Sequence, residues 1–241
     1  MMEKSLSDIK KRCEHLKENY KIVMENVCNA AIKSGRSPED IKLLAATKTV
    51  PVEVINYGID LGIKYIGENR VQELMSKIDN INLDFCNIHF IGHLQRNKVK
   101  QITGKVGMIE SVDSVDLAKE ISKRAVERGV KVDILIEVNV GREENKSGIY
   151  IENLYNLTKE IAKLDNIKIK GLMAIPPKCR NKLELDEYFF KMKKLFVDIR
   201  DKNIDNISID TLSMGMSNDY VNAILNGATE VRVGSALFGI R

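Results

Sequence analysis

Apolar residues in this chain follow two different periods, one helical and one typical of strands. Over the first 34 residues they recur every three or four positions, which predicts one face of a long amphipathic helix. The residues of this face are Ile9, Cys13, Leu16, Tyr20, Met24, Val27 and Ala31. Gly35 and the Ser37-Pro38 step follow, and they indicate that the helix ends there.

Beyond residue 40, short runs rich in Ile and Val alternate with segments of helical period. The runs predict strands at about 42–47, 63–66, 87–91, 106–111, 132–140, 168–174, 207–213 and 229–234. The segments between them predict helices near 52–61, 69–78, 95–103, 114–129, 150–164, 182–202 and 217–226. The helix at 114–129 has the clearest boundaries, since Ser114 suits an N-cap and Gly129 a C-cap.

Eight strands alternating with helices are typical of parallel α/β proteins. A closed eight-stranded barrel and an open doubly wound sheet both fit the alternation. The number eight favours the barrel, and no G-x-G-x-x-G follows the first strand, as a dinucleotide-binding sheet would require. We therefore predict a single (β/α)₈ TIM-type barrel with a long extra N-terminal helix.

No linker or shift in composition marks a second domain, and a barrel of this kind typically needs about 250 residues. We expect one domain over 1–241, with the helix at 1–34 and the barrel at 42–241. Little chain follows the last strand, so the eighth helix should be short or absent. The N-terminal helix is a candidate to cover that gap.

Composition and charge exclude several classes of function. The chain has 38 Lys and Arg against 34 Asp and Glu, and this excess of four is spread along the sequence. Neither nucleic-acid nor membrane binding is indicated, and no apolar run approaches the roughly 20 residues of a membrane span. The cysteines and histidines show no metal-ligand or disulfide spacing, and no signal peptide is apparent. These features predict a soluble cytoplasmic protein without a metal site.

Polar and glycine-rich segments follow the strands, at the edge where barrels build their sites. The loops after strands 7 and 8 are the most informative, with Ser213 to Ser217 in one and Gly234-Ser235 in the other. Ordinary turn glycines would explain either loop alone. Because barrels commonly bind phosphate between these two loops, the pair favours a phosphate site. Ser217 is also expected to cap a helix that begins near Asn218.

Lys48 ends the first predicted strand on the same face as Leu44 and Ala46, which places it at the mouth of the barrel. A solvated strand end is the ordinary interpretation of such a lysine. Beside a phosphate site, however, partial burial would lower the pKa of its amine and make Lys48 a plausible Schiff-base nucleophile.

Arg232 is predicted to point into the barrel together with Glu230 and Gly234, because Val231 and Val233 would face the surrounding helices. A buried arginine requires an acid or a ligand beside it. An internal ion pair, with Glu230 or with a carboxylate of another strand, and a role in ligand binding are both open.

At these residues the chain resembles the pyridoxal phosphate homeostasis protein family, the YggS/PROSC proteins, over essentially its whole length. The motifs that carry the resemblance are Ala45-Ala46-Thr47-Lys48, Gly67-Glu68-Asn69, His89 to Lys98, Lys146-Ser147-Gly148, Gly171 to Pro176, Leu212 to Ser217 and Val231 to Gly239. Ser235 stands where the family often has threonine, so a hydroxyl is kept. The family is similar in fold to the barrel domain of alanine racemase, known as fold type III of the enzymes that use pyridoxal 5′-phosphate (PLP).

The resemblance implies a cofactor, PLP, held as a Schiff base on Lys48. It implies further that Arg232 meets the pyridine nitrogen and that Ser213, Ser217, Gly234 and Ser235 surround the phosphate. Asn69 is expected to approach the cofactor ring. His93 lies within a family motif, but no chemistry is assigned to it.

The function implied is intracellular vitamin B6 homeostasis, in which the protein buffers PLP and delivers it to apo-enzymes without strong catalytic turnover. A PLP-dependent amino-acid racemase is the alternative, but no second catalytic base or C-terminal domain is identified. A Schiff-base aldolase fits less well with a lysine at the end of strand 1. We expect a monomer, and the loop at 141–148 is either a lid or a charged solvent loop.

Overall fold

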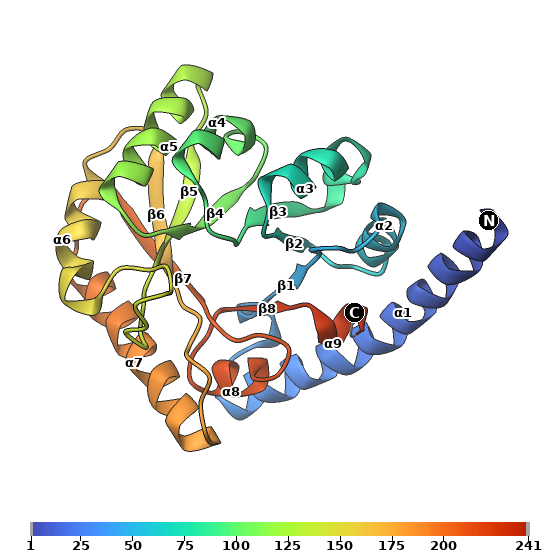
Figure 1. The fold of residues 1–241 in the computed structure, drawn as a ribbon. Helices are drawn as coiled ribbons and strands as arrows, with labels where there is room; N and C mark the ends of the chain where they lie inside the picture. The colour runs from blue at the N-terminus through green and yellow to red at the C-terminus, as the bar shows by residue number, and fades with distance from the viewer. Residues whose placement is uncertain (1, 240–241) are drawn as a thin grey trace.

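The computed structural model describes residues 2–239 and shows a barrel of eight parallel strands (Figure 1). Each strand pairs with the next along the chain, and the eighth pairs with the first. The strands are β1 (Lys42–Ala46), β2 (Tyr65–Glu68), β3 (Asn87–Phe90), β4 (Met108–Val112), β5 (Val132–Glu137), β6 (Ile167–Met173), β7 (Ile207–Ser213) and β8 (Glu230–Val233). The predicted fold class is confirmed. Residues 1, 240 and 241 of the predicted domain lie outside the described residues.

The helices surround the barrel and connect its strands (Figure 1). They are α1 (Met2–Lys33), α2 (Val52–Asp60), α3 (Val71–Lys77), α4 (Val99–Ile102), α5 (Val115–Arg128), α6 (Ile151–Ala162), α7 (Lys182–Asp201), α8 (Tyr220–Leu225) and α9 (Ser235–Phe238). Short 3-10 helices lie at Pro38–Asp40, Ile78–Asn80, Leu83–Phe85 and Arg96–Lys98. The caps predicted for α5 are confirmed, since Ser114 Oγ accepts from Leu117 N and Gly129 adopts a left-handed conformation.

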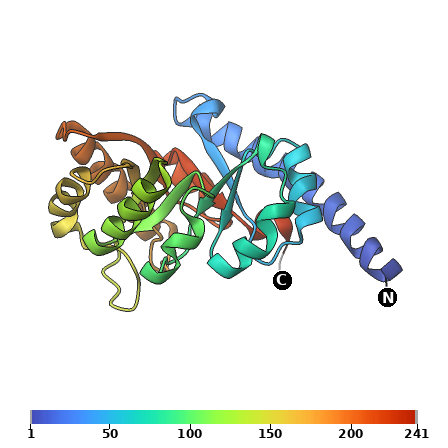
Figure 2. The ribbon, with the colours of Figure 1, turned by 90° about the horizontal axis from the view of Figure 1, so that it is seen from above.

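The long helix α1 covers the gap left by the four-residue α9, as the shortness of the chain after β8 led us to expect. It packs against α2, α8 and α9. Asn19 Nδ2 donates to Leu237 O at 2.9 Å, and Asn26 Nδ2 donates to Tyr220 Oη at 3.0 Å. Figure 2 shows the N-terminal part of α1 running on past the barrel.

Strand residues alternate between two environments. One set, which includes Val231 and Val233, is buried in the large apolar core between barrel and helices. The other set points into the barrel, where apolar side chains form two small groups, Leu44, Ala46 and Ile91 in one and Met108, Leu135 and Met173 in the other. The remaining interior is polar, so the barrel holds charged groups where branched aliphatic residues are usual.

No helix within residues 2–239 combines the length and the apolar character that crossing a membrane would require.

The β6–β7 pairing depends on a glycine at position 171. Its φ is 154°, and a Cβ added there would lie 1.7 Å from Thr211 O on β7. We expect Gly171→Ala to lower the free energy of unfolding by about 3 kcal/mol, because the strands must separate to admit the methyl group.

Gly129→Ala is the matched control, since Gly129 has a φ of 63° and open space around it. It should cost only about 1 kcal/mol of left-handed strain. Urea unfolding of both variants measures the difference, and equal losses would contradict the steric argument.

Candidate functional site

A cavity of about 1010 Å³ opens at the C-terminal ends of β1, β7 and β8. Its walls come from the turn after β1, the loop after β7, the end of β8 with α9, and the N-terminal part of α1. The lining residues are Asp8, Arg12, His15, Ala46, Lys48, Thr49, Val50, Met216, Ser217, Asn218, Asp219, Arg232, Gly234, Ser235, Phe238 and Gly239.

Of the seven predicted cofactor-binding residues, the cavity brings together Lys48, Ser217, Arg232, Gly234 and Ser235. Their meeting follows from barrel closure, since Leu44 pairs with Arg232 and Ala45 with Val233. Asn69 and Ser213 are not among the lining residues. Asn69 follows β2, and Ser213 is wholly buried at the end of β7.

Polar side chains of Glu68, Glu73 and Lys77 hold the turn that carries Lys48. Thr47 Oγ1 donates to Glu68 Oε1 at 2.8 Å, and Lys77 Nζ donates to Thr47 O at 3.1 Å. Thr49 N donates to a carboxylate oxygen of Glu73. Lys48 itself is an exposed residue that lines the cavity, and partial burial of its amine stays a prediction. The residue comes two positions after the end of β1, in the turn that forms one wall of the cavity.

Ser217 does not cap α8 as predicted. That helix begins at Tyr220, with Asp219 as its N-cap residue. Asp219 Oδ1 accepts from Met216 N at 2.5 Å, which closes a tight turn before the helix and directs Ser217 toward β8. Ser217 Oγ instead accepts from Gly234 N at 3.0 Å and from Ala236 N at 3.2 Å. One hydroxyl and two backbone amides therefore converge on one side of the cavity.

Asp219 also lines this side of the cavity. Burial raises the pKa of its carboxyl, against the opposing effects of its bond to Met216 N and the charge of Arg232. The bond to Met216 N occupies one of its oxygens.

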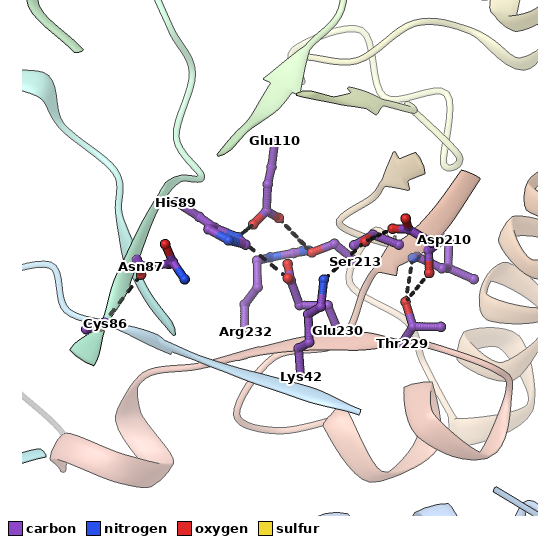
Figure 3. A network of polar contacts seen from close by, with 12 residues as sticks. Lys42, Cys86, Asn87, His89, Glu110, Asp210, Ser213, Thr229, Glu230 and Arg232 are labelled. Carbon is purple, nitrogen blue, oxygen red and sulfur yellow. Dashed lines mark hydrogen bonds and ion pairs between the residues drawn. The ribbon is translucent and has the colours of Figure 1, made fainter. Parts of the chain in front are cut away.

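Arg232 is almost completely buried and points inward, as predicted (Figure 3). Its Nη1 donates to Ser213 Oγ at 2.6 Å, and its Nη2 donates to Ala174 O at 2.9 Å. Nη1 also lies 3.9 Å from Glu110 Oε2. The internal acid that faces the guanidinium is therefore Glu110 of β4, while the same side chain forms part of the cavity wall.

Next to Arg232 in the barrel interior, His89 lies between two buried glutamates, Glu110 and Glu230 (Figure 3). His89 Nδ1 is 2.8 Å from Glu110 Oε1 and 3.5 Å from Glu230 Oε2. Burial alone would lower the pKa of His89, but the two carboxylates raise it to about 10. Burial and the charge of Glu230 raise the pKa of Glu110. Contact with His89 lowers the pKa of Glu230 despite its burial.

The ligand-type atoms of His89, Glu110 and Glu230 all lie within 4.8 Å of one another. The sequence prediction of no metal grouping overlooked this cluster, because its members lie on three strands. A polar residue at an inward position of each strand was the available signal. A protonated His89 balances one of the two carboxylates, and Arg232 balances the other.

The sequence also gave no sign that Asp8, Arg12 and His15 of α1 reach the cavity, since their spacing fits any exposed helix face. His93 lies outside the cavity lining, and its Nδ1 is 3.2 Å from Ser147 Oγ in the loop at 141–148. This contact joins the two family motifs that carry His93 and Ser147.

Comparison with known proteins gives consistent results. The profile of the alanine racemase N-terminal domain family matches residues 13–241. The pyridoxal phosphate homeostasis protein of Aquifex aeolicus is 44% identical over 229 residues, which are 95% of this chain and 98% of that protein. The homeostasis protein of Escherichia coli K12 is 35% identical over 226 residues, which are 92% of this chain and 95% of that protein.

Among solved structures, PipY of Synechococcus elongatus with PLP bound has a TM-score of 0.78 at 29% identity. The match covers 88% of this chain and 100% of PipY. An alanine racemase of Clostridium difficile has a TM-score of 0.75 at 18% identity, covering 95% of this chain and 57% of that one. The second likeness concerns the fold alone. The chain belongs to the pyridoxal phosphate homeostasis proteins, within the alanine racemase N-terminal domain family.

Proposed function

We propose that this protein binds PLP in the cavity at the C-terminal ends of β1, β7 and β8, with Lys48 as its point of attachment, and serves intracellular PLP homeostasis. The observation that carries the proposal is that one cavity presents an amine, two convergent backbone amides and a buried arginine. PipY, a solved structure at 29% identity, contains PLP.

The phosphate is assigned to the side where Gly234 N and Ala236 N meet Ser217 Oγ. Backbone amides and a hydroxyl are common ligands of phosphate oxygens, and a bound phosphate would take the place of Ser217 Oγ as the acceptor of these two amides. Gly234 itself lines the cavity, so its backbone lies at the wall where the phosphate is assigned. The hydroxyl of Ser235, on the same wall, completes the set.

Lys48 supplies the primary amine. PLP supplies an aldehyde, which condenses with an amine to form a carbon–nitrogen double bond with release of water. Thr47 and Thr49 fix the turn around Lys48, so the residue lies at the cavity wall although it is exposed.

Asn69 is assigned to the approach of the cofactor ring. Ala46 pairs with Gly67, and Lys48 and Asn69 each come two residues later, just beyond the ends of β1 and β2. Asn69 Oδ1 is buried and has no hydrogen-bond partner among the described residues. An unsatisfied acceptor of this kind is costly unless a ligand donates to it.

Arg232 is assigned to the pyridine nitrogen. A guanidinium stays charged and donates hydrogen bonds, so it cannot give a proton to that nitrogen. The electron demand of the ring then remains weak, which disfavours carbanion chemistry. We therefore assign the protein a carrier role, buffering PLP and delivering it to apo-enzymes, in place of catalysis. The same proposal includes a cytoplasmic monomer that binds neither nucleic acid nor membranes.

Lys48→Arg is expected to abolish covalent attachment of PLP, because a guanidinium keeps the charge but forms no stable Schiff base. Wild-type protein should absorb in the visible after addition of PLP and should retain the cofactor on one peptide after borohydride reduction. Mass mapping of that peptide is the measurement. Lys163→Ala, at an exposed lysine of the same chain, serves as control. Retention of a reduced adduct in Lys48→Arg would overturn the assignment.

Ser217→Ala is expected to weaken PLP binding about tenfold, because hydrogen bonds to charged groups contribute roughly 1.5 kcal/mol or more. Binding of pyridoxal, which has the ring and the aldehyde but no phosphate, should change little. Titration of the visible band with each ligand measures both constants. Equal weakening for the two ligands would contradict the placement of the phosphate.

Incubation of the PLP-loaded protein with L-alanine should give no sustained formation of D-alanine, because Arg232 leaves the ring a weak electron acceptor. Chiral chromatography over many hours tests this. Multiple turnovers that disappear in Lys48→Arg would replace the carrier role with that of a racemase.

A further inference from the structure

A chain of buried polar side chains extends from the base of the cavity into the barrel, and the proposed cofactor contacts leave most of it unused (Figure 3). It runs from Arg232 on β8 through Ser213 on β7 and Glu110 on β4 to His89 on β3. Ser213 and Glu110 are completely buried, and His89 is nearly so. Four strands thus contribute to one connected network.

The direction of each hydrogen bond in this network can be assigned from its donors. Arg232 Nη1 can only donate, so Ser213 Oγ accepts that bond at 2.6 Å. The single hydroxyl proton of Ser213 is then directed to Glu110 Oε2 at 2.7 Å. The other oxygen of Glu110 accepts from His89 Nδ1 at 2.8 Å. Glu110 therefore acts as the acceptor at the centre of the network.

The charges in the network balance. Arg232 and a protonated His89 carry two positive charges, and Glu110 and Glu230 carry two negative ones. Buried charges of this kind are stable only while each keeps its partners. Lys42 on β1 and Glu137 on β5 also act on the network, on Glu230 and Arg232 respectively. The position of the guanidinium therefore depends on groups that lie below the cavity.

Two of the N–H groups of Arg232 are committed to Ser213 Oγ and Ala174 O. These two bonds, on different terminal nitrogens, fix the plane of the guanidinium. The hydroxyl of Ser213 is occupied on both sides, by Arg232 and by Glu110, and Ser213 does not line the cavity.

We propose that Ser213 and Glu110 are positioning residues, which hold Arg232 in place at the cofactor ring, and that Ser213 is not a phosphate ligand. This inference rests on the proposed function and reassigns one residue of the site predicted from the sequence. It assigns different roles to the two serines of the Leu212 to Ser217 segment. Ser217 contacts the phosphate, and Ser213 holds Arg232 behind the ring.

Comparing the binding of PLP with that of pyridoxal tests whether Ser213 and Ser217 have these separate roles. Ser213→Ala should weaken both ligands by the same factor, on the order of three- to tenfold, since the lost contact acts on the ring and not on the phosphate. It should also shift the absorbance maximum of the bound cofactor in the direction that Arg232→Lys shifts it. Ser217→Ala is the matched control, with an effect on PLP alone.

Two further variants separate positioning from damage to the fold. Ser213→Thr keeps the hydroxyl and should retain the wild-type spectrum and affinity. In an Arg232→Lys background, Ser213→Ala should add little further loss, because contacting residues that act through one another are not additive. Glu110→Gln should shift the same absorbance maximum. Should it fail to fold, the serine variants still decide the question.

Weakening of PLP by Ser213→Ala with unchanged pyridoxal binding would overturn the inference, as would additive losses in the double variant. Either result leaves the proposed function intact. The proposed function fails separately if wild-type protein forms no reducible adduct on Lys48.

Discussion

Pairing of β8 with β1 is the constraint on which the site depends. Lys48 and Arg232 are far apart in the sequence, yet the register Leu44 to Arg232 and Ala45 to Val233 places the two strand ends side by side. The Lys48 turn and the Gly234 loop become neighbours for this reason, and the cavity lies between them. The helix α1 supports the same seam from outside, through its packing on α8 and α9. One sheet closure and one long helix thus account for most of the cavity wall.

A second constraint is the charge inside the barrel. TIM barrels are usually filled by branched aliphatic side chains, but this interior holds Arg232, His89, Glu110 and Glu230 between two small apolar groups. Such a cluster stabilises the fold weakly, because desolvation offsets much of the attraction between its charges. The cluster instead fixes the orientation of Arg232. Two of its N–H groups bond to Ser213 Oγ and Ala174 O, and the side chain lines the cavity. Charged residues therefore replace aliphatic packing in the interior, and they hold the guanidinium of Arg232 in position.

The sequence predicted the barrel well because its elements depend on local pattern. The bounds of β7 and the caps of α5 follow from residues within a few positions. One prediction was wrong where the chain turns sharply. Ser217 does not cap α8 but contacts the end of β8, because Asp219 closes the turn before that helix. The cluster of His89 with Glu110 and Glu230 joins three strands. It was overlooked because the spacing of residues along the sequence does not show which strands face one another.

The two ends of the site also differ in their exposure to solvent, and this difference suits a carrier. Lys48 stands at the exposed rim, where water and free amines can reach a linkage formed on it. Arg232 sits at the buried base, and at the pyridine nitrogen, where we propose it binds, it would leave the cofactor ring a weak electron acceptor. An exposed attachment point favours exchange, while a buried guanidinium disfavours reaction of whatever is attached. A racemase on this scaffold would also need a second base at the rim. Holding PLP reversibly, as we propose, needs only an attachment point and a partner for the ring, the roles that the proposal gives to Lys48 and Arg232.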